Sequence, residues 1–303
     1  YGIIEGNDAG WTSAEILIAF GIAFVLLCAL IVVELRSETP MLPLRFFKRP
    51  AFTGAVLVIG VIFLAVAALG FFIQQYFQIV QGHSALGAGL RSFPMGVMIM
   101  IIAPLSVPLT VRFGPKAMVL AGTVAAALGL LWFSQLNVDS GYPPALVGFL
   151  LIGIGGGLSL TPLTDTVMAS IPVDDAGIGS AINDTSRELG GALGIAGLGA
   201  VVSSIYSSGV KSDLNGLAPD TVVDAASEGV VVAEVLTESL DADAAALVTS
   251  VANANFTDAF TTAFLVGVGI LVAALAVAAT LVPRRMRARQ AEQDRPALSQ
   301  GRR

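Results

Sequence analysis

The sequence predicts an all-α integral membrane protein that crosses the bilayer about seven times. Hydrophobic residues make up 55% of the 303 residues and charged residues only 13%, against about 25% charged in ordinary soluble domains. Seven apolar stretches are each long enough for the roughly 20 helical residues that cross a hydrocarbon core of about 30 Å. In addition, 14 of the 16 lysine and arginine residues fall in every second connection between these stretches.

The alternation of positive charge predicts the orientation of the spans. Only Arg91 and Lys211 lie in the remaining connections. By the positive-inside rule, the C-terminus is predicted to be cytoplasmic and the N-terminal end external. The predicted spans lie near residues 14–33, 51–74, 89–111, 117–136, 144–168, 181–205 and 257–282. The alternating basic residues are Arg36, Arg45, Lys48, Arg49, Arg112, Lys116, Arg187, Arg284, Arg285, Arg287, Arg289, Arg295, Arg302 and Arg303.

Three regions follow from this pattern. Residues 1–50 hold a polar external segment, the first span and a cytoplasmic linker, residues 51–282 hold the other six spans, and residues 283–303 form a basic cytoplasmic tail. The chain begins at Tyr1 without an initiator methionine. Because an odd number of spans with an external start is unusual for a whole protein, we expect the C-terminal part of a longer one.

Proline and glycine mark particular spans. The stretch 89–111 contains three prolines and the stretch 144–168 contains Pro162; bilayer helices tolerate such kinks because neighbouring groups recapture the freed backbone. A dinucleotide-binding fingerprint does not fit, because Leu158 stands where its third glycine belongs and no strand precedes it. Small residues at four-residue spacing instead predict close helix packing. They are Gly153, Gly157, Gly190 and Gly194.

The segment 207–255 differs from the rest of the chain. It carries eight acidic residues and a single basic residue, Lys211. Apolar residues recur there at helical spacing, which predicts one or two surface helices. Acidic residues have little influence on topology, so this acidic loop is interpreted as a solvated external cap. A role in collecting cations is the alternative.

Few residues support enzymatic chemistry. His83 is the only histidine and is placed in an external loop, so no histidine-based metal site or catalytic triad is expected. The nucleotide-binding sequence GxxxxGK[ST] does not occur. The protein is therefore predicted not to be an enzyme and to use no cofactor or metal. Its basic residues also do not gather on one face, as they would in a nucleic-acid-binding protein.

Polar side chains inside the spans are the functional candidates, because ionisable groups in hydrocarbon are costly and tend to mark pathways. Asp165, Arg187 and Glu188 are predicted to lie near the cytoplasmic ends of two spans, where Asp165 and Arg187 are able to pair. The alternative is that they are interfacial anchors. At the other side, Gln74, Gln78 and Gln81 share one helical face, which predicts either substrate contacts or interfacial solvation.

Four stretches resemble the C-terminal half of the fourteen-helix major facilitator transporters of the EmrB/QacA drug:proton antiporter type. They are GHSALGAGLRSFPMGVMIMIIAPL, VRFGPKAMVLAG, GIGGGLSLTPL and AGIGSAINDTSRELGGALGIAG. The opening EGNDAGWTS and the linker PMLPLRFFKRPAF are also similar to that family, so the resemblance covers essentially residues 5–282.

The resemblance implies that the first span is the last of two extra central helices and that the other six form the C-terminal bundle. An N-terminal bundle of the same chain would be its partner, and the spans 51–74, 89–111, 144–168 and 181–205 would line the cavity. Arg112, Gly114 and Lys116 match the family's cytoplasmic gating motif, D-R-x-G-x-[RK], in which they would anchor the inner face. Val111 replaces its acidic residue. Residues tied to proton coupling belong to the absent half.

The resulting hypothesis is a secondary exporter in a bacterial cytoplasmic membrane that exchanges amphipathic or cationic compounds for protons. Its expected partners are the lipid bilayer, a small-molecule substrate and protons. One alternative is a narrow-specificity metabolite or nutrient transporter of the same fold, because one architecture serves many substrates. Another is a membrane sensor or scaffold that has lost transport.

Overall fold

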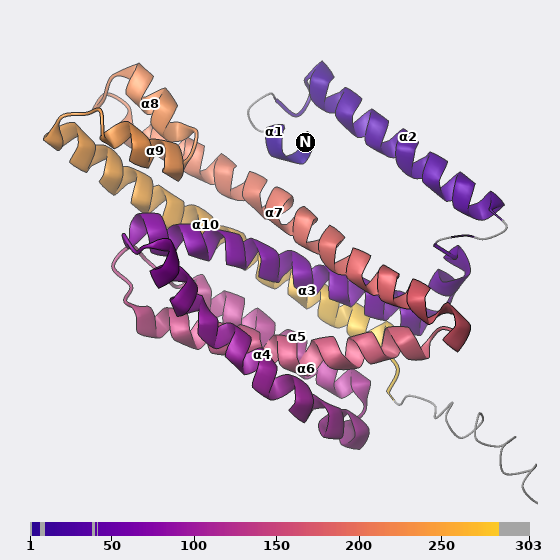
Figure 1. The fold of residues 1–303 in the computed structure, drawn as a ribbon. Helices are drawn as coiled ribbons and strands as arrows, with labels where there is room; N and C mark the ends of the chain where they lie inside the picture. The colour runs from indigo at the N-terminus through magenta and orange to yellow at the C-terminus, as the bar shows by residue number, and fades with distance from the viewer. Residues whose placement is uncertain (1, 7–9, 38–39, 41, 285–303) are drawn as a thin grey trace, which may run out of the picture.

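A computed structural model describes residues 2–6, 10–37, 40 and 42–284, and helices are the only regular secondary structure within them (Figure 1). Seven helices are long and apolar enough to cross a membrane. The predicted all-α membrane fold with about seven spans is therefore confirmed. Of the predicted basic tail at 283–303, all but the first two residues lie outside the described residues.

The first spanning helix stands apart from the others. α2 (Ala14–Arg36) begins after Ser13, whose hydroxyl accepts a hydrogen bond from the backbone N–H of Ile16 (3.4 Å). Ile16 is the one buried residue of this helix. Figure 1 shows α2 separate from the main bundle, next to the short helix α1 (Gly2–Glu5). A helix that is apolar on all sides is stable only in lipid or against another apolar surface.

The other six spanning helices form one bundle (Figure 1). Proline opens three of them, at the position where a missing N–H costs no intrahelical hydrogen bond. α6 packs on α4 and α5, α3 packs on α7, and α10 contacts α3, α5 and α7. Their bounds are α3 (Pro50–Gln75), α4 (Ala85–Phe113), α5 (Pro115–Phe133), α6 (Tyr142–Ala169), α7 (Ala176–Leu214) and α10 (Ala242–Leu281).

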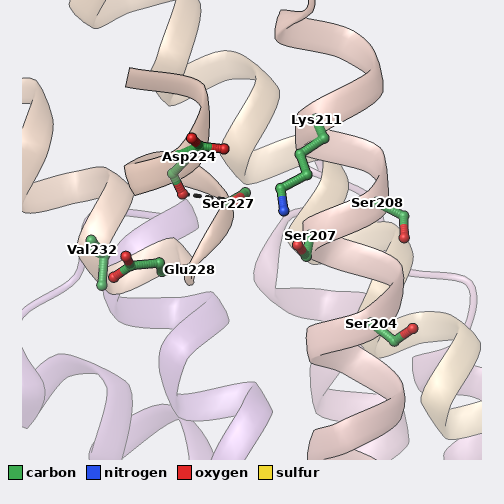
Figure 2. Close-up of a pocket in the computed structure, with 8 residues that line it drawn as sticks. All are labelled: Ser204, Ser207, Ser208, Lys211, Asp224, Ser227, Glu228 and Val232. Carbon is green, nitrogen blue, oxygen red and sulfur yellow. Dashed lines mark hydrogen bonds between the residues drawn. The ribbon is translucent and has the colours of Figure 1, made fainter. Parts of the chain in front are cut away.

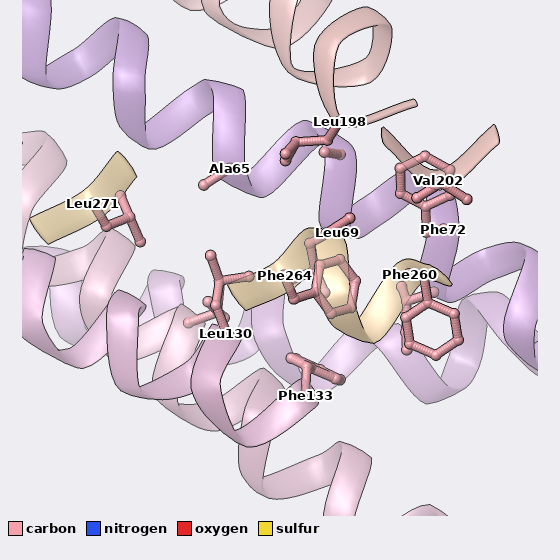
Figure 3. Close-up of a cluster of buried hydrophobic side chains, with 14 of the residues drawn as sticks. Ala65, Leu69, Phe72, Leu130, Phe133, Leu198, Val202, Phe260, Phe264 and Leu271 are labelled. Atoms are coloured by element: carbon pink, nitrogen blue, oxygen red, sulfur yellow. The ribbon is translucent and has the colours of Figure 1, made fainter. Parts of the chain in front are cut away.

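Aromatic and aliphatic side chains fill the space between α3, α5, α7 and α10 (Figure 3). Phe264 of α10 lies between two other rings, with centroid distances of 5.3 Å to Phe260 and 6.1 Å to Phe133. Leu69 and Leu198 are buried in the same cluster. Because lipid tails are as apolar as leucine, this packing holds the helices together by close contact rather than by the hydrophobic effect.

Glycines set the closest approaches between helices. A Cβ atom placed on Gly190 would collide with the carbonyl group of Gly60, and one on Gly194 with the carbonyl group of Leu64, so α7 lies directly on the backbone of α3. In the same way, a Cβ on Gly153 would lie 2.7 Å from the carbonyl oxygen of Met95 in α4. Gly157 has a similar position, 2.6 Å from the Cβ of Ile102.

The acidic loop is shorter than predicted. α7 continues to Leu214 and α10 begins at Ala242, so both helices extend well into the segment 207–255. These extensions pack on each other, and Asn255 Nδ2 donates a hydrogen bond to Asp213 Oδ2 (2.9 Å). Between them lie α8 (Asp220–Ser227) and α9 (Val230–Thr237). Hydrophobicity alone missed these extensions because they are amphipathic rather than uniformly apolar.

The two ends of the bundle differ in character. The capped end carries α8 and α9, where α3, α5 and α7 finish. The basic end carries the α2–α3 linker, the α4–α5 turn and the α6–α7 loop, together with Arg284 after α10. The backbone of α10 and of Arg284 closes this end, since Gly54 lies against Leu281 and Gly114 against the carbonyl group of Arg284.

Candidate functional site

A polar cluster joins α6 and α7 within the spanning region. We define it as Thr164, Asn183, Asp184 and Arg187. Arg187 Nη2 donates a hydrogen bond to Thr164 Oγ1 (3.2 Å), and that hydroxyl donates to Asn183 Oδ1 (3.4 Å). Asn183, which is buried, donates from Nδ2 to Asp184 Oδ1 (3.3 Å). The four side chains therefore form a continuous chain of hydrogen bonds between two helices.

The guanidinium group of Arg187 is held from two sides. Its Cζ lies 5.3 Å from the centroid of the Phe63 ring in α3, and its Nη2 binds Thr164 in α6. The contacts of Gly190 and Gly194 with α3 bring this part of α7 close enough for the stacking. Arg187 Nε is buried and has no hydrogen-bond partner in the described part of the protein. A buried polar atom without a partner costs free energy, typically 1–3 kcal/mol.

Arg187 lies in the fourth turn of α7. Its position is about 16 Å along the helix axis from Ala176, at 1.5 Å per residue. Its guanidinium group reaches Thr164, which lies five residues before Ala169, the last residue of α6. Asp165 directly follows Thr164 in the same helix. The Asp165 backbone and the Arg187 guanidinium group therefore lie at about the same level along the bundle.

The predicted pairing of Asp165 with Arg187 is wrong. Both residues are described, and no ion pair or hydrogen bond joins them; Arg187 binds the neighbouring Thr164 instead. Adjacent residues of a helix project about 100° apart, so α6 presents only one of them to α7. Asp165, Asp184 and Glu188 are all exposed. Asp184 and Glu188 are four residues apart and therefore lie on the same face of α7.

The predicted glutamine stripe is also divided. A π-helical turn at Tyr76–Val80 follows α3 and changes the helical register. Gln74 Nε2 donates to Ser92 Oγ in α4 (3.1 Å), whereas Gln81 Nε2 donates to the Tyr76 hydroxyl (2.9 Å) and to the carbonyl group of Ser140. Gln78 is exposed. The three amides thus have different surroundings, and only Gln78 is left free for another molecule.

The candidate gating turn connects α4 to α5 at the basic end. Gly114 has φ 87° and ψ 155°, a backbone conformation that only glycine adopts readily. Arg112 lies with its Cζ 5.2 Å from the centroid of the Phe113 ring. Lys116 is half-buried. Neither basic side chain forms a hydrogen bond or ion pair with the residues that the structure describes, so their predicted anchoring bonds are absent there.

Replacement of Gly114 by alanine is expected to destabilise the bundle. The required backbone conformation costs a non-glycine residue roughly 1–3 kcal/mol, and the new Cβ would collide with the carbonyl group of Arg284. The melting temperature in detergent should fall. The matched control is Gly141→Ala, because Gly141 also precedes a helix but has φ −68°. Equal melting temperatures for the two variants would contradict this account of the turn.

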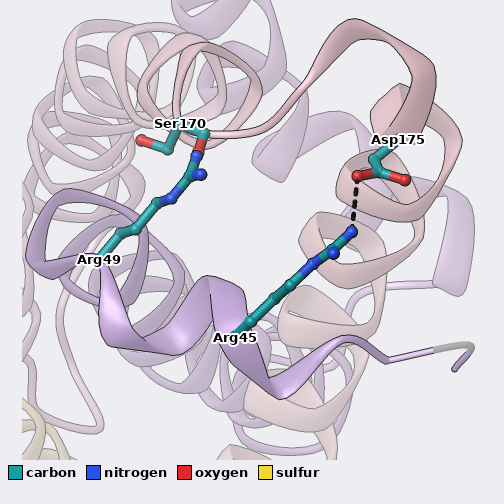
Figure 4. Close-up of polar contacts among 4 residues, drawn as sticks. All are labelled: Arg45, Arg49, Ser170 and Asp175. Atoms are coloured by element: carbon teal, nitrogen blue, oxygen red, sulfur yellow. Dashed lines mark hydrogen bonds and ion pairs between the residues drawn. The ribbon is translucent and has the colours of Figure 1, made fainter.

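A second set of contacts at the basic end links the α2–α3 linker to the α6–α7 loop (Figure 4). Arg45 Nη2 lies 3.2 Å from Asp175 Oδ2, and Arg49 donates a hydrogen bond to the carbonyl group of Ser170. The Cζ atoms of the two arginines lie 5.1 and 5.8 Å from the centroid of the Phe46 ring. Because the Arg45 side chain is 68% exposed, its ion pair contributes little to stability.

Sequence reasoning missed two members of the arrangement around Arg187. Nothing in the sequence distinguishes Thr164 from other threonines of the apolar spans, and the place of Phe63 depends on the α3–α7 crossing. Asn183 had a usable signal, because its position four residues before Arg187 puts both on one face of α7.

Long apolar helices pack side by side, and the polar cluster lies between two of them. These features define a multi-pass helical membrane protein. Over residues 6–195 the sequence matches the Major Facilitator Superfamily, and the chain belongs to that superfamily.

Several relatives have been given functional names. The chain is 34% identical to "Multidrug resistance protein Stp" of Mycobacterium tuberculosis over 73% of this chain and 41% of that protein. It is 31% identical to "Multidrug efflux pump LfrA" of Mycolicibacterium smegmatis, over 88% of this chain and 52% of that protein. With "Cephamycin export protein CmcT" of Amycolatopsis lactamdurans the identity is 33%, over 70% and 44%. The chain thus spans about two fifths to one half of the length of these relatives.

Proposed function

We propose that this chain is the C-terminal bundle of a proton-coupled exporter of amphipathic organic compounds. The observation that carries the proposal is Arg187, a guanidinium group held between α3, α6 and α7 by Phe63 and Thr164. Ionisable groups in the membrane are expensive to maintain and occur mainly where a pathway needs them. The names of the relatives Stp and LfrA support efflux of more than one compound.

The orientation and partner follow from the same proposal. The basic end faces the cytoplasm of a bacterium, because arginine and lysine concentrate there. A second bundle of the same protein packs against the exposed faces of this one, and the two bundles rock around a site near the middle of the membrane. Substrate and protons use this site in turn.

The charges around Arg187 provide a means of coupling. Asp165, Asp184 and Glu188 are exposed, while the guanidinium group of Arg187 is fixed in place. Protonation of a carboxylate changes the local charge by one unit, which in a medium of low dielectric constant is a large energetic change. A cationic substrate and a proton then compete for the same carboxylates, so that binding of one favours release of the other.

Uptake of ethidium into inverted membrane vesicles tests the proposal. The vesicles contain the full-length gene product, with or without an imposed proton gradient. Gradient-dependent uptake that a protonophore abolishes is the expected result. Vesicles with correctly inserted protein and no uptake of ethidium or of other organic cations would overturn it.

Replacement of Asp165 by asparagine is expected to reduce gradient-dependent uptake strongly, because asparagine cannot bind and release a proton. Folding and insertion should be unchanged, since Asp165 is exposed and makes no ion pair with another described residue. The matched control is Asp174→Asn, which removes an exposed carboxylate from the α6–α7 loop. Unchanged uptake in the Asp165 variant would identify this residue as an interfacial anchor.

A narrower substrate range is the second candidate, favoured by the similarity to an export protein named for one class of compound, cephamycin. A panel of structurally unrelated organic cations separates the two. An exporter of broad specificity transports several of them, whereas a narrow exporter transports none or one.

A further inference from the structure

A largely apolar chamber lies at the capped end, between α3, α7 and the turn that joins α8 to α9. Its volume is about 410 Å³, within the usual range for small-molecule sites. Three phenylalanine rings line it, Phe71 and Phe72 from α3 and Phe256 from α10. α7 contributes small residues such as Gly199, where a Cβ would be no closer than 3.9 Å to any neighbouring group. Small residues of α7, among them Gly199 and Ala200, thus leave room between this helix and the rings of α3.

Three polar side chains line the same chamber without internal partners. They are Gln75 of α3, Ser203 of α7 and Glu228 at the end of α8. None of the three side chains forms a hydrogen bond or ion pair with the residues that the structure describes, whereas the nearby Tyr206 hydroxyl donates to the carbonyl group of Ala226 (2.9 Å). A concave apolar site with a few unengaged polar groups is the usual form of a ligand pocket.

Glu228 also lines a larger polar pocket of about 780 Å³, which Figure 2 shows between α7 and α8. Its other lining groups include Ser204, Lys211 and Asp224. Lys211 lines only this polar pocket, so a molecule in the apolar chamber meets the carboxylate of Glu228 and not the ammonium group. Glu228 is therefore the one charged residue among those that line the apolar chamber.

We propose that this chamber binds an organic cation, with its apolar body among Phe71, Phe72 and Phe256 and its charge beside Glu228. Aromatic faces attract cations and a carboxylate adds direct attraction. An anion of the same shape meets repulsion from Glu228. The site lies at the capped end, away from Arg187. The proposal rests on the proposed function only in that the ligand belongs to the class of compounds that the protein exports.

The test measures occupancy of this chamber directly. In the full-length gene product, Cys28 and any cysteine outside these 303 residues are replaced by serine, and Ser203→Cys places a thiol in the chamber. The labelling rate with uncharged methyl methanethiosulfonate is measured against increasing tetraphenylphosphonium, and against tetraphenylborate, which has the same shape and the opposite charge. Ser250→Cys is the control, because Ser250 is exposed on α10 and lines neither pocket.

Tetraphenylphosphonium is expected to slow labelling of the Ser203→Cys variant and not of the Ser250→Cys variant. Adding Glu228→Gln should raise the half-protecting concentration about tenfold, the size expected for one lost opposite charge near the surface, and should not weaken protection by tetraphenylborate. Glu234→Gln should change neither value, since Glu234 is exposed on α9 and lines neither pocket.

Absence of protection at saturating tetraphenylphosphonium, or protection that does not depend on Glu228, would overturn the proposal. Ethidium uptake separates this result from the proposed function. Proton-driven uptake without protection would support the proposed export function and contradict the proposed binding site. Glu228-dependent protection without uptake would support the binding site and contradict the export function.

Discussion

Replacement of Arg187 by lysine is expected to lower gradient-dependent ethidium uptake about tenfold, and replacement by alanine to abolish it. A lysine ammonium group is a compact charge that cannot lie flat over Phe63 while it also bonds Thr164. Loss of the stacking contact alone is worth roughly 0.5–2 kcal/mol, and about 1.4 kcal/mol corresponds to a factor of ten. The measurement is the initial uptake rate per inserted protein.

Arg91→Lys is the matched control for this substitution. The Arg91 guanidinium also lies over an aromatic ring, 5.9 Å from the centroid of Tyr142, and donates one hydrogen bond, to the carbonyl group of Gly87 (3.1 Å). It lies near the start of α4, at the capped end. If both lysine variants reduce uptake equally, the effect belongs to arginine packing in general and not to the polar cluster.

Replacement of Gly194 by alanine is expected to have the largest effect on stability. The added methyl group would collide with the backbone carbonyl of Leu64, which cannot move aside as a side chain would. Overpacking of this kind costs about 1–3 kcal/mol. The melting temperature of the purified protein should fall, and uptake should fall with it because α7 no longer holds Arg187 against Phe63.

Gly197→Ala, in the same helix, separates packing from helix propensity. Alanine favours a helix by about 1 kcal/mol over glycine at either position. A Cβ on Gly197 meets no atom within 4 Å, so this variant should be as stable as the parent or more so. A Gly194 variant that is equally stable would show that α3 and α7 are not in backbone contact in the membrane.

The fold was largely predictable because its main signal is local. Each span is a long apolar stretch, and the structure has a helix at all seven predicted places. The outer parts of α7 and α10 gave a weaker signal. There, polar residues such as Asp213 and Asn255 face each other across two helices, and their contact depends on which helices are neighbours.

The candidate site was less predictable because it depends on relations between helices. The sequence identified Asp165, Arg187 and Glu188 as charges in apolar surroundings. It gave the wrong partner for Arg187, since the rotation of α6 that presents Thr164 to α7 is not encoded in any local pattern. The π-helical turn at Tyr76–Val80 had no sequence signal either, and it separated the glutamines that ideal helical spacing groups together.

The length of α7 places its tip at the capped end far from its backbone contact with α3. Beyond its seat on α3 at Gly194, α7 continues to Leu214, about 30 Å further along its axis at 1.5 Å per residue. This outer arm packs on α10 through Gly209 and Asn255 and holds α8 through Tyr206. A tilt of about 10° at the seat displaces the tip by about 5 Å. A rotation of α7 inside the membrane would thus appear at its tip as a displacement that a pair of probes, one on the tip and one on α5, would measure.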